Sequence, residues 1–271
     1  MPIGLILGLF TFASLLSVFA FNHKTKRLFN SYWFYSISSV IALIYFLSFR
    51  WVDDLKALIN VQGQSDILWS KVLLLDMCPF LAVFLPIVLL VDKKRTFAPC
   101  LAYFAIVGAG ITIFGEIAWV KLEDTNLSWW QYTFFNKLYF IMHFYIFIMA
   151  FIVILNSPTF NWNRVLAAHG YAIGYFSYIS IMAFSLDVKQ NVTGIVPFDW
   201  SSLGQYRVIG QFLNLPWPWA PIIGFTFVWI WILLMMALRN IMVLDQRYLD
   251  LKQIEIPRCR NWFLKFYDWI S

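Results

Sequence analysis

The sequence predicts an all-α membrane protein that crosses the bilayer several times. Of its 271 residues, 61% are hydrophobic and only 13% are charged, whereas about a quarter of the residues in a typical soluble protein are charged. The apolar residues also fall in runs of about 20, the length that a helix needs to cross the hydrocarbon core. These two observations exclude a soluble globular class.

Seven apolar runs are long enough to be transmembrane helices, and they define a transmembrane domain over residues 1–240. The first run follows Met1 without the basic segment or cleavage site of a signal peptide, so we expect it to be a membrane span. In chain order, the predicted spans are Ile3–Phe21, Tyr32–Phe49, Leu68–Val91, Phe97–Trp119, Phe134–Leu155, Val165–Ser185 and Trp219–Leu238.

The basic residues predict the orientation. Thirteen of the 20 Lys and Arg residues fall in the loops and tail on one side of these spans, and seven fall on the other. Since the side richer in Lys and Arg normally faces the cytoplasm, we predict an outer N-terminus, a cytoplasmic C-terminus and a multi-pass protein of the plasma membrane. We therefore expect the basic residues, which give the chain a net charge of +6, to interact with membrane lipids. No nucleic-acid motif is present, and nucleic acid is not an expected partner.

Two segments outside the spans are candidate contacts for partner proteins. The connection Leu186–Pro218 is long and carries several Gly and Pro residues, and such a loop is often a lid or a docking surface. The tail over residues 241–271 ends in RNWFLKFYDWIS, which places aromatic residues on one helical face. This pattern predicts an amphipathic helix at the membrane surface, with simple anchoring as the plainer interpretation.

Small residues within two spans predict close helix packing. Gly108 and Gly110 lie in the fourth span, and Gly170 and Gly174 have small-xxx-small spacing in the sixth. Such residues let the backbones of neighbouring helices approach each other in membranes. Packing without any binding site is the plainer interpretation of both pairs.

The third span contains an acid and a thiol, Asp76 and Cys78, in the segment LLLDMCPF. Charged groups are costly in hydrocarbon, so they usually line an interior site. On a regular helix these two residues would point about 200° apart, so we expect a distortion, which Pro79 could supply. The plainer interpretation is that Asp76 neutralises Lys71 or Lys137 and that Cys78 only packs.

His143 is the predicted partner of Cys78. Both lie about ten residues from the outer ends of their spans, which corresponds to a depth of about 15 Å. A histidine within hydrogen-bond reach activates a thiol, and an acid such as Asp76 can orient the histidine. His169 lies near the cytoplasmic end of its span and is excluded on depth, and a simple bond between His143 and a tyrosine is the plainer alternative.

Other polar residues in the outer half complete the predicted site. Lys71, Lys137 and Glu116 are candidates for substrate binding, since a lysine can hold a phosphate headgroup as a point charge. The sequence has none of the Cys and His spacings of zinc sites, so we predict no metal and no cofactor. We expect no disulfide among Cys78, Cys100 and Cys259, because none of them falls in an oxidising loop.

Three segments give the chain a family resemblance. The run Leu73–Val91, the run Ala102–Glu116 and the sequence FIMHFYI around His143 resemble the YwaF-type integral membrane proteins. That family has bacterial members of unknown role, and its animal relatives include a transmembrane acyltransferase that remodels ether phospholipids. The androgen-induced membrane hydrolases, which cleave acyl esters with an intramembrane nucleophile and a histidine, are more distant.

The resemblance implies that Cys78 is the family cysteine and His143 the family histidine. Where the family commonly reads L-P-L-H-x-C, this chain reads L-L-L-D-M-C, so the proline and the first histidine are replaced.

Three functions follow as hypotheses. They are intramembrane acyl transfer or ester hydrolysis on lipids, a non-catalytic subunit of a larger assembly, and a carrier whose path includes Asp76, Glu116, Lys137 and His143.

Overall fold

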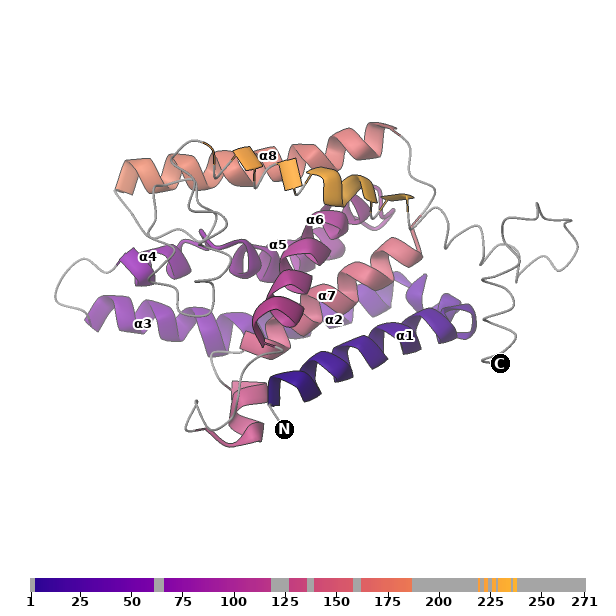
Figure 1. The fold of residues 1–271 in the computed structure, drawn as a ribbon, viewed down its shortest axis with the longest axis horizontal. Helices are drawn as coiled ribbons and strands as arrows, with labels where there is room; N and C mark the ends of the chain where they lie inside the picture. The colour runs from indigo at the N-terminus through magenta and orange to yellow at the C-terminus, as the bar shows by residue number, and fades with distance from the viewer. Residues whose placement is uncertain are drawn as a thin grey trace, which may run out of the picture.

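The chain forms a bundle of long helices, and the computed structural model has helix as the regular structure in every part that it describes (Figure 1). It describes residues 3–60, 66–117, 127–135, 139–157 and 162–186, and positions 219, 222, 223, 226, 227, 229–234, 236 and 237. The α-helices are α1 (Ile3–Phe29), α2 (Tyr32–Phe46), α3 (Val52–Asn60), α4 (Asp66–Val72), α5 (Met77–Val91), α6 (Ala98–Ile111), α7 (Tyr139–Leu155) and α8 (Trp162–Leu186). Short π-helices are η1 (Leu47–Trp51), η2 (Thr112–Glu116) and η5 (Gln131–Phe135).

The helical membrane class is confirmed at the level of apolar spans. Five helical segments are long and apolar enough to cross a membrane, and they are Ile3–Asn22, Tyr32–Asn60, Leu68–Val91, Ala98–Gly115 and Val165–Leu186. In the fifth predicted span, α7 is apolar but shorter, with 17 residues. The seventh is helical at each described position between 219 and 237. The total of seven spans, the orientation and the choice of membrane stay predictions.

Two of the predicted partner segments fall outside the described residues. The long connection is described only as far as Leu186, where α8 ends, and the tail over residues 241–271 lies wholly outside. The docking and anchoring roles of these segments therefore stay predictions.

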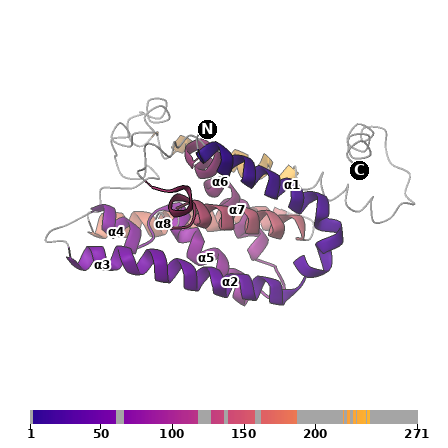
Figure 2. The same ribbon diagram turned by 90° about the horizontal axis from the view of Figure 1, so that it is seen from below.

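Helix α6 is the centre of the bundle. Every residue from Ala98 to Ala109 is buried, because α6 packs against α5, α7 and α8. By contrast, α2 exposes Trp33, Ile37 and Ile41, the kind of surface that a membrane helix presents to lipid. In Figure 2, α2 and α3 lie in line as one rod on the outside of the bundle, joined through η1.

Close packing at the glycines is confirmed for one pair and wrong for the other. A Cβ added to Gly108 would collide with the Met77 side chain, and one added to Gly110 would lie 3.1 Å from Phe147. These two glycines thus let α5 and α7 approach α6. At Gly170 and Gly174, no atom in the described part of the chain lies within 4 Å of an added Cβ, so small-xxx-small spacing did not predict a helix contact there.

Candidate functional site

The third span is broken near its N-terminal end, between the end of α4 at Val72 and the start of α5 at Met77. Leu74 has a left-handed backbone, with a φ of 55°. The Leu75 N–H donates to the Ser70 carbonyl at 2.7 Å, and the Leu74 N–H donates to the Lys71 carbonyl at 3.1 Å. This is the Schellman arrangement that ends a helix, usually with glycine at the left-handed position.

The predicted distortion is therefore present, but Pro79 is not its cause. Pro79 lies in the first turn of α5, where proline is tolerated because the N–H that it lacks would have no helical partner. The turn at Leu74 produces the distortion instead. We call residues Leu73–Asp76 the break.

Side chains from other helices bind the carbonyl groups at the break. The Tyr178 hydroxyl donates to the Leu73 carbonyl at 2.5 Å, and the Tyr175 hydroxyl donates to the Leu75 carbonyl at 2.8 Å. From η1, the Trp51 indole N–H donates to the Val72 carbonyl at 2.9 Å. Because a carbonyl without a partner is costly in hydrocarbon, these three bonds stabilise the break.

Sequence reasoning missed these three donors. Tyr175 and Tyr178 are three residues apart on α8, a spacing that places two side chains on one helix face. That spacing was the available signal, but many aromatic residues in membrane helices share it. The carbonyls that they bind lie about a hundred residues earlier in the chain.

Asp76 and Cys78 lie together where α5 starts. Asp76 is the N-cap residue and has an extended backbone, with φ −77° and ψ 140°, and Cys78 is the second residue of the helix. The Cys78 Sγ lies 3.8 Å from the Thr112 Oγ1, and the Thr112 hydroxyl donates to the Gly108 carbonyl. Since Asp76 is outside the helix, the opposed directions expected on a regular helix do not apply.

His143 lies on α7, and the buried ion pair of Arg50 and Asp54, which we call the Arg50 cluster, lies on η1 and α3. The imidazole is 2% exposed, and its Nδ1 lies 2.6 Å from the Tyr139 carbonyl oxygen. A carbonyl only accepts, so Nδ1 carries the hydrogen and Nε2 is the nitrogen that can take up a proton.

The Arg50 cluster holds a buried ion pair. The Arg50 Nε lies 3.0 Å from the Asp54 Oδ2, and both residues are 8% exposed. Both residues come after the predicted span Tyr32–Phe49, and sequence reasoning assigned them no role in the site. Their spacing of four residues on one helix face was the signal for the pair.

The structure thus groups the predicted site residues in two places. Asp76 and Cys78 lie at the start of α5, next to the Leu75 carbonyl that Tyr175 binds, and His143 lies on α7, bonded to the Tyr139 carbonyl. The pairing of Cys78 with His143 stays a prediction.

The predicted substrate-binding residues have different outcomes. Lys71 is half-buried in the last turn of α4, directly before the break. Glu116 ends η2, but its side chain lies outside the described residues, as does all of Lys137. Among the described residues, no three His, Cys, Asp or Glu side chains come close enough together to hold a metal ion.

Comparisons with known proteins give a family without a function. A model described as "Family of unknown function (DUF5378)" matches residues 9–262. Uncharacterized protein MG135 of Mycoplasma genitalium is 29% identical over 244 residues, which cover 84% of this chain and 86% of the relative. The MG135 homolog of Mycoplasma pneumoniae is 35% identical over 150 residues, covering 54% of this chain and 52% of that protein. No solved structure matches the chain.

Proposed function

The chain belongs to the DUF5378 family, whose function is unknown, and we propose that it is a membrane enzyme that transfers or hydrolyses lipid acyl groups at the break. The observation that carries the proposal is the position of Cys78. Its thiol lies on the second residue of a helix that starts inside an apolar span, beside the Thr112 hydroxyl. The resemblance to the YwaF-type proteins supplies the reaction class.

A helix start suits acyl chemistry because its first N–H groups have no partner one turn earlier. In the proposed reaction, the Cys78 sulfur attacks the carbonyl carbon of a lipid ester while its proton passes to the His143 Nε2. The N–H groups at the start of α5 stabilise the resulting oxyanion. The ester C–O bond then breaks, and the leaving alcohol takes the proton from His143. Water or a second hydroxyl next attacks the Cys78 thioester and gives its proton to the His143 Nε2; the C–S bond breaks, and the Cys78 thiolate takes that proton back.

The packing of α5 against α7 supports a role for His143. Ala82 lies one helical turn after Cys78, on the same face of α5. It lines a pocket together with Met142 and Tyr145, which lie on either side of His143 in the chain. Helix α5 packs against α7, and in the proposed reaction Cys78 and His143 meet across this contact.

The remaining predicted residues have supporting roles in this proposal. Asp76 orients the groups at the start of α5, and Lys71 holds the phosphate of the substrate headgroup as a point charge. Lys137 and Glu116 would complete the headgroup site; the Glu116 side chain and all of Lys137 lie outside the described residues.

Substitution of Cys78 tests the enzyme proposal, and the chain offers a matched control. Cys78→Ser and His143→Ala in purified, reconstituted protein are expected to abolish acyl transfer between phospholipids and labelling by a lipid-like thiol probe. Cys100→Ser changes a buried cysteine of α6 away from the break and is expected to leave both signals unchanged. Turnover that survives in both Cys78→Ser and His143→Ala would refute the proposal.

A carrier is the second candidate, and the break itself favours it. Discontinuous membrane helices form the substrate and ion sites of many transporters, and the break places Asp76 at such a discontinuity. In sealed proteoliposomes, Asp76→Asn would then abolish substrate-driven proton movement, while Cys78→Ser would leave it unchanged. The opposite pattern would favour the enzyme.

The non-catalytic subunit stays a third proposal. It rests on the connection after Leu186 and on the tail, which lie outside the described residues. Purification after mild solubilisation tests it, because a subunit is expected to co-purify with stoichiometric partner proteins and a lone enzyme is not.

A further inference from the structure

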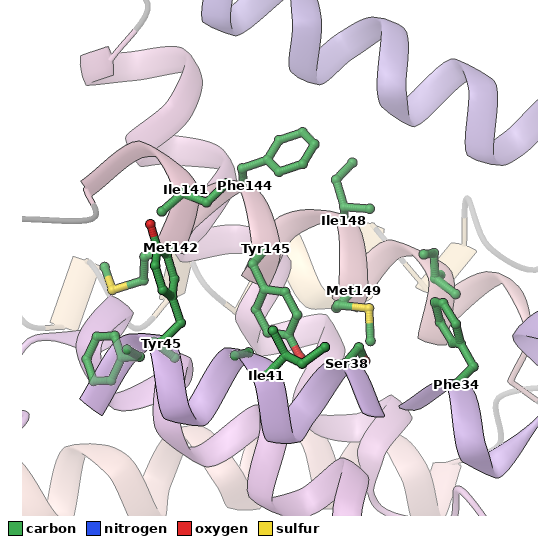
Figure 3. Close-up of a pocket in the computed structure, with 14 residues that line it drawn as sticks. Phe34, Ser38, Ile41, Tyr45, Ile141, Met142, Phe144, Tyr145, Ile148 and Met149 are labelled. Carbon is green, nitrogen blue, oxygen red and sulfur yellow. The ribbon is translucent and has the colours of Figure 1, made fainter. Parts of the chain in front are cut away.

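A pocket of about 450 Å³ lies between α2 and α7 (Figure 3). Its wall is aliphatic and aromatic, with hydroxyl groups only from Ser38, Tyr45 and Tyr145. The volume is in the range of ligand sites, roughly 300–1,000 Å³. We call this pocket the groove, and we propose that it binds one acyl chain of a phospholipid from the surrounding bilayer, with the lipid phosphate at the turn between α5 and α6.

The dimensions of the groove fit a single extended chain. Its α2 wall runs from Phe34 to Phe46, an advance of 12 residues (46 − 34), which is about 18 Å at 1.5 Å per residue. One leaflet contributes about half of a hydrocarbon core that is roughly 30 Å thick. Because α2 belongs to a membrane-crossing segment, the groove runs along the direction in which lipid chains lie.

The far walls of the groove explain why it stays open beside α2. Phe144 of α7 turns away from α2 and stacks on Phe10 of α1, with ring centroids 5.3 Å apart. Figure 3 shows the Tyr145 ring directed toward Ser38 and Ile41 of α2, across the middle of the groove. With Phe144 turned toward α1, the space alongside Tyr145 is open to a chain that enters from the bilayer.

The Phe34 end of the groove carries positive charge. The first turn of α2 is bonded to the end of α5, since the Tyr32 hydroxyl donates to the Leu90 carbonyl at 2.8 Å. The Lys93 Nζ lies 5.5 Å from the centre of the Tyr32 ring, and Lys93 and Lys94 are both exposed. A lysine ammonium binds phosphate as a point charge, so the charge at this end is complementary to a phospholipid headgroup.

This lipid site is independent of the proposed enzyme. Lys93 and Lys94 follow the last residue of α5, whereas Cys78 lies at its first turn, so the phosphate would bind at the opposite end of α5 from the thiol. The lipid of the groove is thus a bound component and not the substrate. Loss of activity in Cys78→Ser has no bearing on it.

Photo-crosslinking tests the groove directly. The protein is reconstituted in nanodiscs of phosphatidylcholine with a minor fraction of phosphatidylglycerol that carries a diazirine on its acyl chain, and the labelled positions are mapped by mass spectrometry. Ile41 in the groove and Ile173 on α8 are a matched pair, because they are 63% and 60% exposed. We expect several-fold more label around Ile41; equal labelling would mean annular lipid only and would overturn the proposal.

Two substitutions separate the chain site from the phosphate site. Ala42→Phe fills the groove and is expected to remove the excess label, while Ile173→Phe on α8 leaves it unchanged. With the diazirine on phosphatidylglycerol in one sample and on phosphatidylcholine in another, the lysines are expected to favour the anionic lipid, and Lys93→Gln with Lys94→Gln is expected to abolish that preference while the chain stays bound. Label that persists at Ile41 in folded Ala42→Phe protein would overturn the proposal, and if that variant does not fold, the Ile41 and Ile173 comparison in the unchanged protein decides.

Discussion

The break and the Arg50 cluster provide partners for buried polar groups in opposite ways. At the break, the helix is interrupted, and tyrosines of α8 bind the carbonyls of Leu73 and Leu75. In the Arg50 cluster, the helix continues through the π-helix η1, and the charges of Arg50 and Asp54 are paired on the same segment. At the break, neutral side-chain donors bind carbonyl groups of an interrupted helix. In the Arg50 cluster, the helix is not interrupted, and two side-chain charges pair with each other.

This difference bears on where chemistry can occur. In the ion pair, the two charges interact with each other. At the start of α5, by contrast, the first N–H groups have no helical partner, and they and the Cys78 thiol can interact with a ligand. The Trp51 bond to the Val72 carbonyl ties the two regions together. Arg50 lies within the π-helix η1, and Thr112, which contacts Cys78, is the first residue of the π-helix η2. Such π-helical segments often occur at functional sites.

The largest expected effect is in the Arg50 cluster. Asp54→Ala removes one partner of a buried ion pair and leaves Arg50 without its carboxylate, which typically costs about 3–5 kcal/mol of stability. The free energy of unfolding in detergent, measured by denaturant titration, checks this. The double variant Arg50→Met with Asp54→Leu leaves no buried charge and is expected to lose much less. Equal losses in the two variants would show that the ion pair is not the source of the effect.

A smaller effect is expected at the break. Tyr175→Phe leaves the buried Leu75 carbonyl without its donor, which costs about 1–3 kcal/mol. Tyr178→Phe is expected to cost less, because Tyr178 is only half-buried. Tyr171→Phe, one turn earlier on α8, is the matched control, and the same denaturant titration measures all three. If Tyr171→Phe costs as much as Tyr175→Phe, the hydroxyl bonds do not stabilise the break.

Hydropathy predicted the membrane segments because each one is a long run of the sequence. The ends of the third span, Leu68 and Val91, are the same in the prediction and in the structure. The break inside it was not predictable in this way, since LLLD contains neither glycine nor proline. Its left-handed turn depends on tyrosines about a hundred residues later in the chain, and one sequence carries no sign of that contact.

The sequence predicted how deep the site residues lie in the membrane, but it did not predict which neighbours they contact. Counting residues gives the depth of Cys78 and His143 in the membrane, but depth says nothing of the rotation of each helix about its axis. Rotation decides that Cys78 lies against Thr112 and that the His143 imidazole is buried inside the bundle. The packing of α6 between its neighbours sets these rotations, and packing is a property of the whole bundle.

The smallest expected effect tests the break by its sign. Leu74→Gly and Leu74→Ala both remove the packing of the Leu74 side chain, so the difference between them reports the backbone alone. At a φ of 55°, glycine is expected to be more stable than alanine by about 1 kcal/mol, because alanine retains the left-handed strain. At Val83, within α5, the order reverses, since glycine costs about 1 kcal/mol relative to alanine inside a helix. Alanine that is more stable than glycine at both positions would mean that the third span is a continuous helix, and the contrast with the Arg50 cluster would disappear.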